Sequence, residues 1–276
     1  MTRRSLLPAA GAAALSMQTS QAAGGGRIKQ SVSKWCYGKM TTEELCIEAK
    51  RIGLKGIDLV NDTDWPTIQK FGLTPAMTPG AGTIPNAYNR KENHDKLDQE
   101  MRINIDKAAA AKVPNVITFS GNRKGMSDQE GMENCVIGLK RVAKYAEDKG
   151  VTINLELLNS KVNHKDYMAD HTAWGVDVIK QVGSPRVKLL YDIYHMQIME
   201  GDIIRTIQQN IQYIGHFHTG GVPGRHELDE TQELNWRAVA TAIADLKYDG
   251  FFAHEFVPAS KTPIKSLEEA FKLCDV

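Results

Sequence analysis

The chain has 276 residues, 42% of them hydrophobic and 24% charged, which is an ordinary balance for a globular protein with a large core. Its 34 Lys and Arg residues nearly cancel 33 Asp and Glu residues, so no long-range field attracts nucleic acid or an anionic membrane. The four cysteines, Cys36, Cys46, Cys135 and Cys274, lack the spacing of a zinc site or a disulfide framework.

The first 23 residues have the layout of an export signal. Arg3 and Arg4 precede an apolar run over residues 6–17, and small residues follow it. The arginine pair resembles a twin-arginine signal, which predicts a bacterial protein exported to the periplasm already folded. The alternative is a disordered extension of a cytoplasmic protein. The apolar run is too short for a membrane span of about 20 residues, so we predict a signal peptide over residues 1–23 and one domain over residues 24–276.

After residue 27, short apolar runs alternate with longer amphipathic runs, as in repeated βα units around a parallel sheet. The expected strands span residues 31–35, 56–60, 73–77, 115–120, 151–157, 187–193, 213–219 and 251–256. The expected helices span residues 41–52, 94–111, 128–149, 172–182, 236–246 and 266–273. Eight strands in this order predict an α/β fold, a single-domain (β/α)8 barrel.

Residues 78–91 and 220–232 interrupt the repeat and are expected to be long loops, which in compact domains are often lids or binding loops. A doubly wound open sheet would give a similar alternation. It would also place a Gly-rich phosphate-binding turn after the first strand, where residues 35–38 read Trp-Cys-Tyr-Gly instead. Thr41 and Glu44 form a capping-box pattern at the start of the first helix.

Four potential metal ligands, Glu156, Asp192, His218 and Glu255, fall at the ends of four successive expected strands. They are separated by 36, 26 and 37 residues, each about one βα unit of a barrel. Strand ends of a barrel meet at the face that carries the active site, so the four side chains are predicted to converge there.

Side-chain alternation supports this placement. If Glu156 points into the barrel, Asn154 and Thr152 share its face, and Lys188 lies below Asp192 in the same way. Polar residues beneath the ligands are unusual in a barrel interior and are expected to support them.

Three carboxylates and one imidazole form a hard ligand set that suits Mg²⁺ or Mn²⁺, with Co²⁺ or Zn²⁺ as alternatives. Any one of these residues alone would be interpreted as an ordinary surface acid or strand-end residue. Four of them in apolar segments indicate a metal site, because a buried charge is costly unless a partner or a metal compensates it.

Residues 31–258 resemble the xylose-isomerase-like TIM barrel superfamily, and more narrowly the hydroxypyruvate isomerases. The resemblance rests on Glu-Leu-Leu-Asn-Ser-Lys at 156–161, Leu-Tyr-Asp-Ile-Tyr-His-Met-Gln at 190–197, Gly-His-Phe-His-Thr-Gly-Gly-Val-Pro-Gly-Arg at 215–225 and Glu-Leu-Asn-Trp at 233–236. It implies that Glu156 and Glu255 transfer protons as well as bind the metal.

The resemblance also implies substrate contacts. His195 looks like a substrate-contacting histidine of related ketose epimerases, and Arg225 looks like their loop arginine. A substrate carboxylate would need a cationic partner, for which Arg225, Lys161 and Arg123 are the candidates in that order. Trp35 is expected to end the first strand and wall the pocket, with rim packing as the alternative.

The implied reaction interconverts hydroxypyruvate and tartronate semialdehyde through an enediolate, with a small-molecule substrate as the partner. Two alternatives stay open: a ketose 3-epimerase or other sugar isomerase, and a noncatalytic periplasmic metabolite-binding barrel. Barrels of this superfamily commonly form homo-oligomers, but the sequence indicates no subunit number. Of the other histidines, His254 is expected to be structural. His216 is expected to be a hydrogen-bonded core residue, with orientation of the metal site as the alternative. His164 is expected to be solvated, with a place at the mouth of the site as the alternative.

Overall fold

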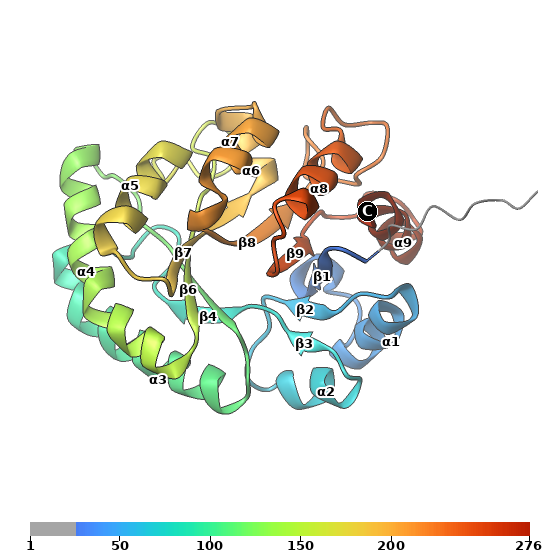
Figure 1. Ribbon diagram of the computed structural model, residues 1–276, viewed down its shortest axis with the longest axis horizontal. Helices are drawn as coiled ribbons and strands as arrows, with labels where there is room; N and C mark the ends of the chain where they lie inside the picture. Colours follow the sequence, from blue (N-terminus) through green and yellow to red (C-terminus); the bar gives the residue numbers. More distant parts are fainter. Residues whose placement is uncertain (1–25) are drawn as a thin grey trace, which may run out of the picture.

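The computed structural model describes residues 26–276, so the predicted signal peptide over residues 1–23 lies outside the described residues. Parallel strands form the centre and helices surround them (Figure 1). The strands are β1 Lys29–Ser33, β2 Gly56–Asp58, β3 Thr74–Pro75, β4 Thr78–Ala81, β5 Asn115–Thr118, β6 Thr152–Glu156, β7 Val187–Asp192, β8 Ile214–Thr219 and β9 Phe251–His254. The α-helices are α1 Thr42–Ile52, α2 Trp65–Lys70, α3 His94–Ala110, α4 Asp128–Lys149, α5 Thr172–Val182, α6 Ile193–Met199, α7 Ile203–Asn210, α8 Trp236–Asp245 and α9 Pro263–Cys274.

The strand order is β3-β2-β1-β9-β8-β7-β6-β5-β4, and every pairing is parallel. β3 and β4 are two halves of the third barrel strand, one paired with β2 and the other with β5, so the chain itself closes the barrel. Each half contains a proline, which has no N–H to donate to a neighbouring strand. The (β/α)8 fold predicted from the sequence is therefore confirmed.

Several predicted boundaries were wrong. Residues 78–91, expected to be a loop, begin with strand β4. Trp35 does not end the first strand, because β1 ends at Ser33 and a short 3-10 helix, η1 (Lys34–Tyr37), carries the tryptophan. The helices α2, α6 and α7 were not predicted, since six to eight residues are too few to show a helical period.

The start of α1 matches its sequence signal. The Thr41 hydroxyl accepts a hydrogen bond from the Glu44 backbone N–H, and the Glu44 carboxylate accepts one from the Thr41 N–H. Losing such a cap costs about 1 kcal/mol. We expect Thr41→Ala to lower the free energy of unfolding by about that amount in urea titrations, whereas Thr41→Ser, which keeps the hydroxyl, should stay near wild type. Equal stability of the alanine variant would contradict this role of the cap.

The barrel interior is polar below the carboxyl ends of the strands. Asn154 of β6 is buried and donates to the Asn115 side chain of β5 over 3.1 Å. A Cβ on Gly215 would lie 2.4 Å from the Asn154 Oδ1 atom, so only glycine fits there. The large apolar core lies instead between the strands and the helices, and its packing holds the strand ends in place.

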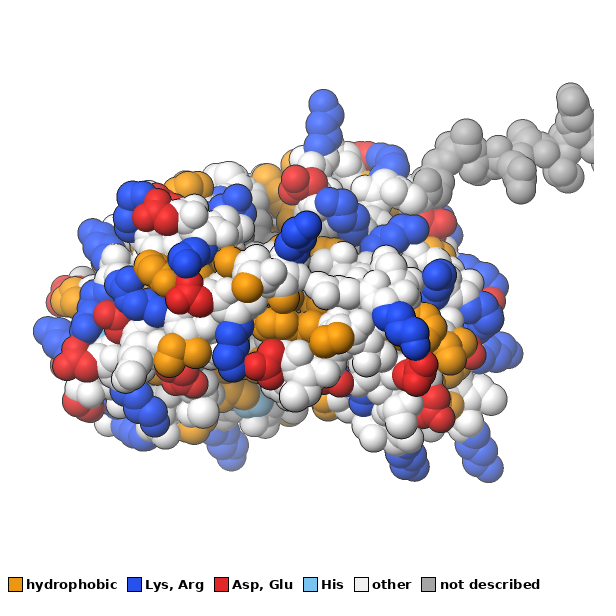
Figure 2. All heavy atoms as spheres, turned by 90° about the horizontal axis from the view of Figure 1, so that it is seen from below, with side chains coloured by type: hydrophobic (Ala, Val, Ile, Leu, Met, Phe, Trp, Pro, Cys, Tyr) orange, Lys and Arg blue, Asp and Glu red, His pale blue; other side chains and the backbone are white. Residues whose placement is uncertain are grey.

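Acidic and basic side chains are interspersed over the face that Figure 2 shows. Between residues 26 and 276, none of the helices has both the length and the apolar character needed to cross a bilayer.

Candidate metal and catalytic site

The structure brings Glu156, Asp192, His218 and Glu255 together at the carboxyl ends of the strands. Glu156 and Asp192 are the last residues of β6 and β7, His218 lies on β8 and Glu255 directly follows β9. Asp192 pairs in register with His218, and the Glu255 N–H donates to the Thr219 carbonyl of β8 over 3.1 Å. One ligand atom from each of the four residues lies within 4.8 Å of the others.

The His218 imidazole is the centre of this cluster. Its Nδ1 atom lies 2.6 Å from Glu255 Oε2, 3.3 Å from Glu156 Oε1 and 4.0 Å from Asp192 Oδ2. It nevertheless completes no hydrogen bond to any of residues 26–276. A buried imidazole nitrogen that faces three carboxylates fits a divalent cation, because the ion would replace a ring proton and accept a lone pair from each of the four groups.

Burial and neighbouring charges shift the pKa values of the three carboxylates in the cluster. Burial raises the pKa of Glu156 to about 7, against the opposing effect of His218, and burial also raises the pKa of Asp192. Burial alone would raise the pKa of Glu255 too, but the charges of His218 and Arg225 outweigh it and hold that pKa well below its usual range. A bound divalent cation would favour the ionised form of all three carboxylates.

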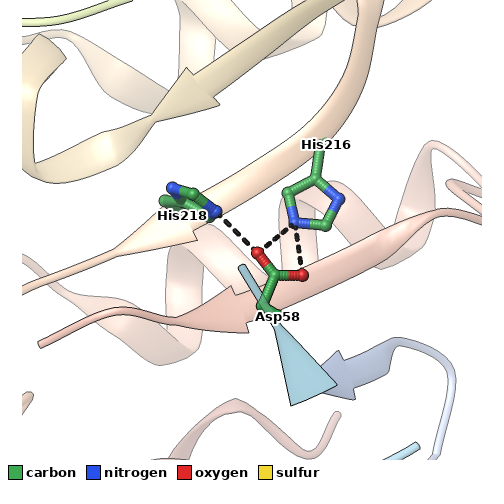
Figure 3. A group of neighbouring side chains, drawn as sticks. All are labelled: Asp58, His216 and His218. Atoms are coloured by element: carbon green, nitrogen blue, oxygen red, sulfur yellow. Dashed lines mark hydrogen bonds and ion pairs between the residues drawn. The ribbon is translucent and has the colours of Figure 1, made fainter. Parts of the chain in front are cut away.

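Asp58 is a site residue that the sequence analysis missed. It is the last residue of β2, it is fully buried, and its Oδ2 atom lies 2.9 Å from Nε2 of His218 (Figure 3). His216, expected to be structural, is buried and contacts the same carboxylate. In the sequence, Asp58 is a single acid in an apolar run, and it lacks the regular spacing that pointed to the four predicted metal ligands.

His195 and Arg225 lie beside the cluster. The Arg225 Nη2 atom is 2.6 Å from Asp192 Oδ2 and 2.5 Å from Glu255 Oε2, and its Nη1 atom is 2.6 Å from His195 Nε2. The Asn159 backbone N–H donates to Nδ1 of His195 over 3.1 Å, so the ring proton of neutral His195 lies on Nε2. Burial lowers the pKa of His195 well below its usual range, which keeps the ring neutral.

The backbone around Arg225 is tightly constrained. Arg225 has a φ of 60°, a left-handed conformation that costs a non-glycine residue about 1 kcal/mol. Its N–H donates to the Gly221 carbonyl, and its own carbonyl accepts from the Val257 N–H. A Cβ on Gly220 would lie 2.9 Å from Arg225 Cγ, so this close approach requires glycine. The loop over residues 220–232, predicted to be a binding loop, thus presents Arg225 to the cluster.

A cavity of about 570 Å³ opens over these residues. The Trp35 indole lies at its edge and donates to Glu255 Oε1 over 2.6 Å. His164, expected to be solvated, lines the cavity and packs against the His195 ring. The full lining consists of Trp35, Leu59, Pro79, Ile84, Ile117, Phe119, Glu156, Leu158, Asn163, His164, His195, Arg225 and Glu255.

Two cationic side chains that were predicted to contact substrate, Lys161 and Arg123, do not line this cavity. The Lys161 ammonium donates to the carbonyls of Ile198 and Met199, and the Arg123 guanidinium pairs with Asp170. Neither lines the cavity in the described part of the chain. Both follow strand ends in sequence, but their loops turn the long side chains toward backbone and carboxylate partners elsewhere. The structure therefore brings neither side chain to the cavity, and the contact of either with substrate stays a prediction.

The fold and the site together define an α/β-barrel protein with a carboxylate–imidazole centre at the carboxyl ends of its strands. Residues 48–274 match the family model described as xylose isomerase-like TIM barrel, and the chain belongs to this family.

Curated relatives extend this assignment. Proteins named "Putative hydroxypyruvate isomerase" from Danio rerio and Homo sapiens are 30% and 26% identical over 127 and 247 residues. The first match covers 46% of both chains, and the second covers 88% of this chain and 84% of the human protein. A 2-oxo-tetronate isomerase from Cupriavidus necator is 35% identical over 120 residues, or 44% of this chain and 45% of that protein. The chain thus spans about half the length of the zebrafish and Cupriavidus relatives.

Solved structures share the fold. A Brucella melitensis protein described as an AP endonuclease, family 2, superposes with a TM-score of 0.77 at 23% identity, covering 87% of this chain and 97% of that one. D-psicose 3-epimerase with D-tagatose, from Clostridium cellulolyticum H10, gives a TM-score of 0.70 at 20% identity, covering 90% and 98%. At these identities the likeness concerns the barrel alone.

Proposed function

We propose that this protein is a metal-dependent isomerase that moves a proton between adjacent carbons of a small hydroxy-carbonyl acid. The reaction proposed is the interconversion of hydroxypyruvate and tartronate semialdehyde through an enediolate. The relatives named as hydroxypyruvate and 2-oxo-tetronate isomerases support this class of substrate. The predicted export to the periplasm stays a prediction.

Two carboxylates are available for the proton transfer. Glu156 and Glu255 both line the cavity and both contact His218. In this scheme one glutamate removes the C3 proton of hydroxypyruvate, and the other serves C2 or the hydroxyl oxygen. Trp35 orients Glu255 through its indole N–H. A divalent cation held by Glu156, Asp192, His218 and Glu255 would supply Lewis-acid stabilisation of the negative charge that develops on the substrate oxygens.

The observation that carries the proposal is the pair of Arg225 and His195, which both line the cavity. Nη1 of Arg225 lies 2.6 Å from Nε2 of His195, and Nδ1 on the other side of the ring accepts from the Asn159 N–H. A substrate oxygen that binds beside this pair would replace the contact between the two side chains and accept a hydrogen bond from each of them. Arg225 is the one Lys or Arg side chain among residues 26–276 that lines the cavity, which makes it the candidate partner for the substrate carboxylate.

A second candidate, a ketose 3-epimerase, is supported by the size and the partly apolar lining of the cavity. Leu59, Ile84 and Phe119 contribute to that lining, and about 570 Å³ is more space than a three-carbon acid fills. An enediolate mechanism would use the same four ligands and the same two glutamates on a longer neutral polyol.

The test is to load the purified protein with Mn²⁺ or Mg²⁺ in D₂O and follow deuterium incorporation by NMR. Hydroxypyruvate is compared with D-fructose, D-tagatose and D-psicose. Exchange and conversion of hydroxypyruvate alone would support the first candidate. Turnover of ketoses without hydroxypyruvate would replace it by the second, and no exchange in any compound would favour a metabolite-binding barrel.

Arg225 provides a sharper test of substrate charge. A hydrogen bond to a charged group contributes about 1.5–3 kcal/mol, so Arg225→Gln should raise the KM for hydroxypyruvate about 10- to 100-fold. The KM for a neutral ketose should change less. Arg102→Gln, which alters a guanidinium on α3 paired with Asp98, is the matched control. An unchanged KM for hydroxypyruvate in Arg225→Gln would exclude the proposed carboxylate contact.

A further inference from the structure

Asp58 is a carboxylate buried inside the barrel with two histidines as its partners. It ends β2, whereas both histidines lie on β8, and β1 and β9 separate these strands in the sheet. The Asp58 side chain therefore reaches across the barrel interior to its partners (Figure 3). Its Oδ2 atom is 2.9 Å from Nε2 of His218, and Nε2 of His216 lies 3.2 Å from each Asp58 oxygen.

These contacts determine which His218 nitrogen carries the proton. An ionised carboxylate accepts hydrogen bonds and donates none, so the nitrogen facing Asp58 has to be the N–H. The proton of neutral His218 is then on Nε2, and the lone pair is on Nδ1. This is the nitrogen that faces Glu156, Asp192 and Glu255 and that makes no hydrogen bond with any described residue.

His216 holds the carboxylate in this position. Its ring nitrogen contacts both Asp58 oxygens and stands at an angle of 87° to the His218 ring, with 5.2 Å between the centroids. All three side chains are fully buried. A buried carboxylate is costly for folding, and an apolar residue would fill such a position without that cost. A role for Asp58 in orienting His218, the predicted metal ligand that it contacts, would explain why an acid is buried here.

We propose that Asp58 is a positioning residue for the metal centre, and that His216 fixes the Asp58 carboxylate in turn. Asp58 sets the tautomer and the ring orientation of His218 so that the Nδ1 lone pair points at the cation. Partners of this kind on metal-bound histidines contribute substantially to metal affinity. The inference rests on the proposed metal site but not on the choice of substrate.

The test measures Mn²⁺ binding to metal-free protein by titration calorimetry. Asp58→Asn keeps the size of the side chain but removes its charge and offers an N–H to His218. We expect this variant to bind Mn²⁺ about 10- to 100-fold more weakly than wild type. Asp170→Asn is the matched control, because Asp170 is also a buried acid and pairs with Arg123 away from the site. It should bind Mn²⁺ as wild type does.

A second measurement needs no variant. In ¹⁵N-histidine-labelled wild-type protein loaded with Mg²⁺, the NMR signals of His218 should show the proton on Nε2. A proton on Nδ1, or an Asp58→Asn variant that is folded and binds Mn²⁺ within about threefold of wild type, would overturn the proposal. Failure of the wild-type protein to bind any divalent cation would instead defeat the proposed metal-dependent function.

Discussion

Glu156→Gln and Glu255→Gln should each reduce the rate of proton exchange into substrate by about 10²- to 10⁴-fold. Glutamine has nearly the same shape as glutamate but takes up no proton under these conditions, so it removes the base or acid while the cavity keeps its volume. The measurement is deuterium incorporation into hydroxypyruvate, or into whichever ketose the protein turns over, at saturating substrate and Mn²⁺.

Because both glutamates are also proposed metal ligands, the loss of exchange has to be separated from loss of the metal. Mn²⁺ occupancy of each variant is measured by calorimetry, and the rates are compared at full occupancy. Glu133→Gln, an exposed glutamate on α4, is the matched control and should retain the wild-type rate. If either site variant keeps full activity while the metal is bound, the mechanism with two proton-transferring glutamates fails.

The fold and four residues of the candidate site were predictable because their signals repeat along the chain. Each βα unit contributes one apolar run, and Glu156, Asp192 and Glu255 each stand at the end of such a run. Parallel strands bring their carboxyl ends to one face, so spacing in sequence becomes proximity in space. No knowledge of side-chain contacts was needed for this step.

Asp58 shows where that reasoning stops. The apolar run predicted a second strand over residues 56–60, which put Asp58 in its middle, whereas β2 ends at Asp58. Its partner His218 is 160 residues away in the chain. A contact between one acid and one histidine across the barrel produces no periodic pattern in the sequence, because the two residues meet only when the barrel closes.

Lys161 shows a related limit for long side chains. The sequence made it a candidate partner for a substrate carboxylate, but its ammonium donates to the carbonyls of Ile198 and Met199 at the end of α6. The direction of a flexible side chain on a loop depends on which backbone groups need a partner. That information lies in the tertiary structure, as it does for the short helices α2, α6 and α7.

Removing divalent cations with EDTA should abolish the proposed activity and lower the melting temperature. Glu156, Asp192 and Glu255 lie around one imidazole nitrogen, and a cation that binds only the folded protein relieves their mutual repulsion. At a free Mn²⁺ concentration of 100 times Kd, binding stabilises the fold by about 2.7 kcal/mol. For a chain of this size, this corresponds to a shift in Tm of about 5–10 °C.

The pattern of rescue then identifies the metal and tests the ligand set together. Mg²⁺, Mn²⁺, Co²⁺ and Zn²⁺ are added back separately, with Tm and deuterium exchange measured for each. Softer or tighter-binding ions are expected to raise Tm more than Mg²⁺, whereas exchange should be highest with Mn²⁺ or Mg²⁺ if the oxygen-rich set selects the working ion. Asp192→Asn, which removes one carboxylate charge, should show a much smaller Tm response to every ion. A wild-type protein whose Tm and activity are unchanged after EDTA treatment would show that the cluster does not act as a metal centre.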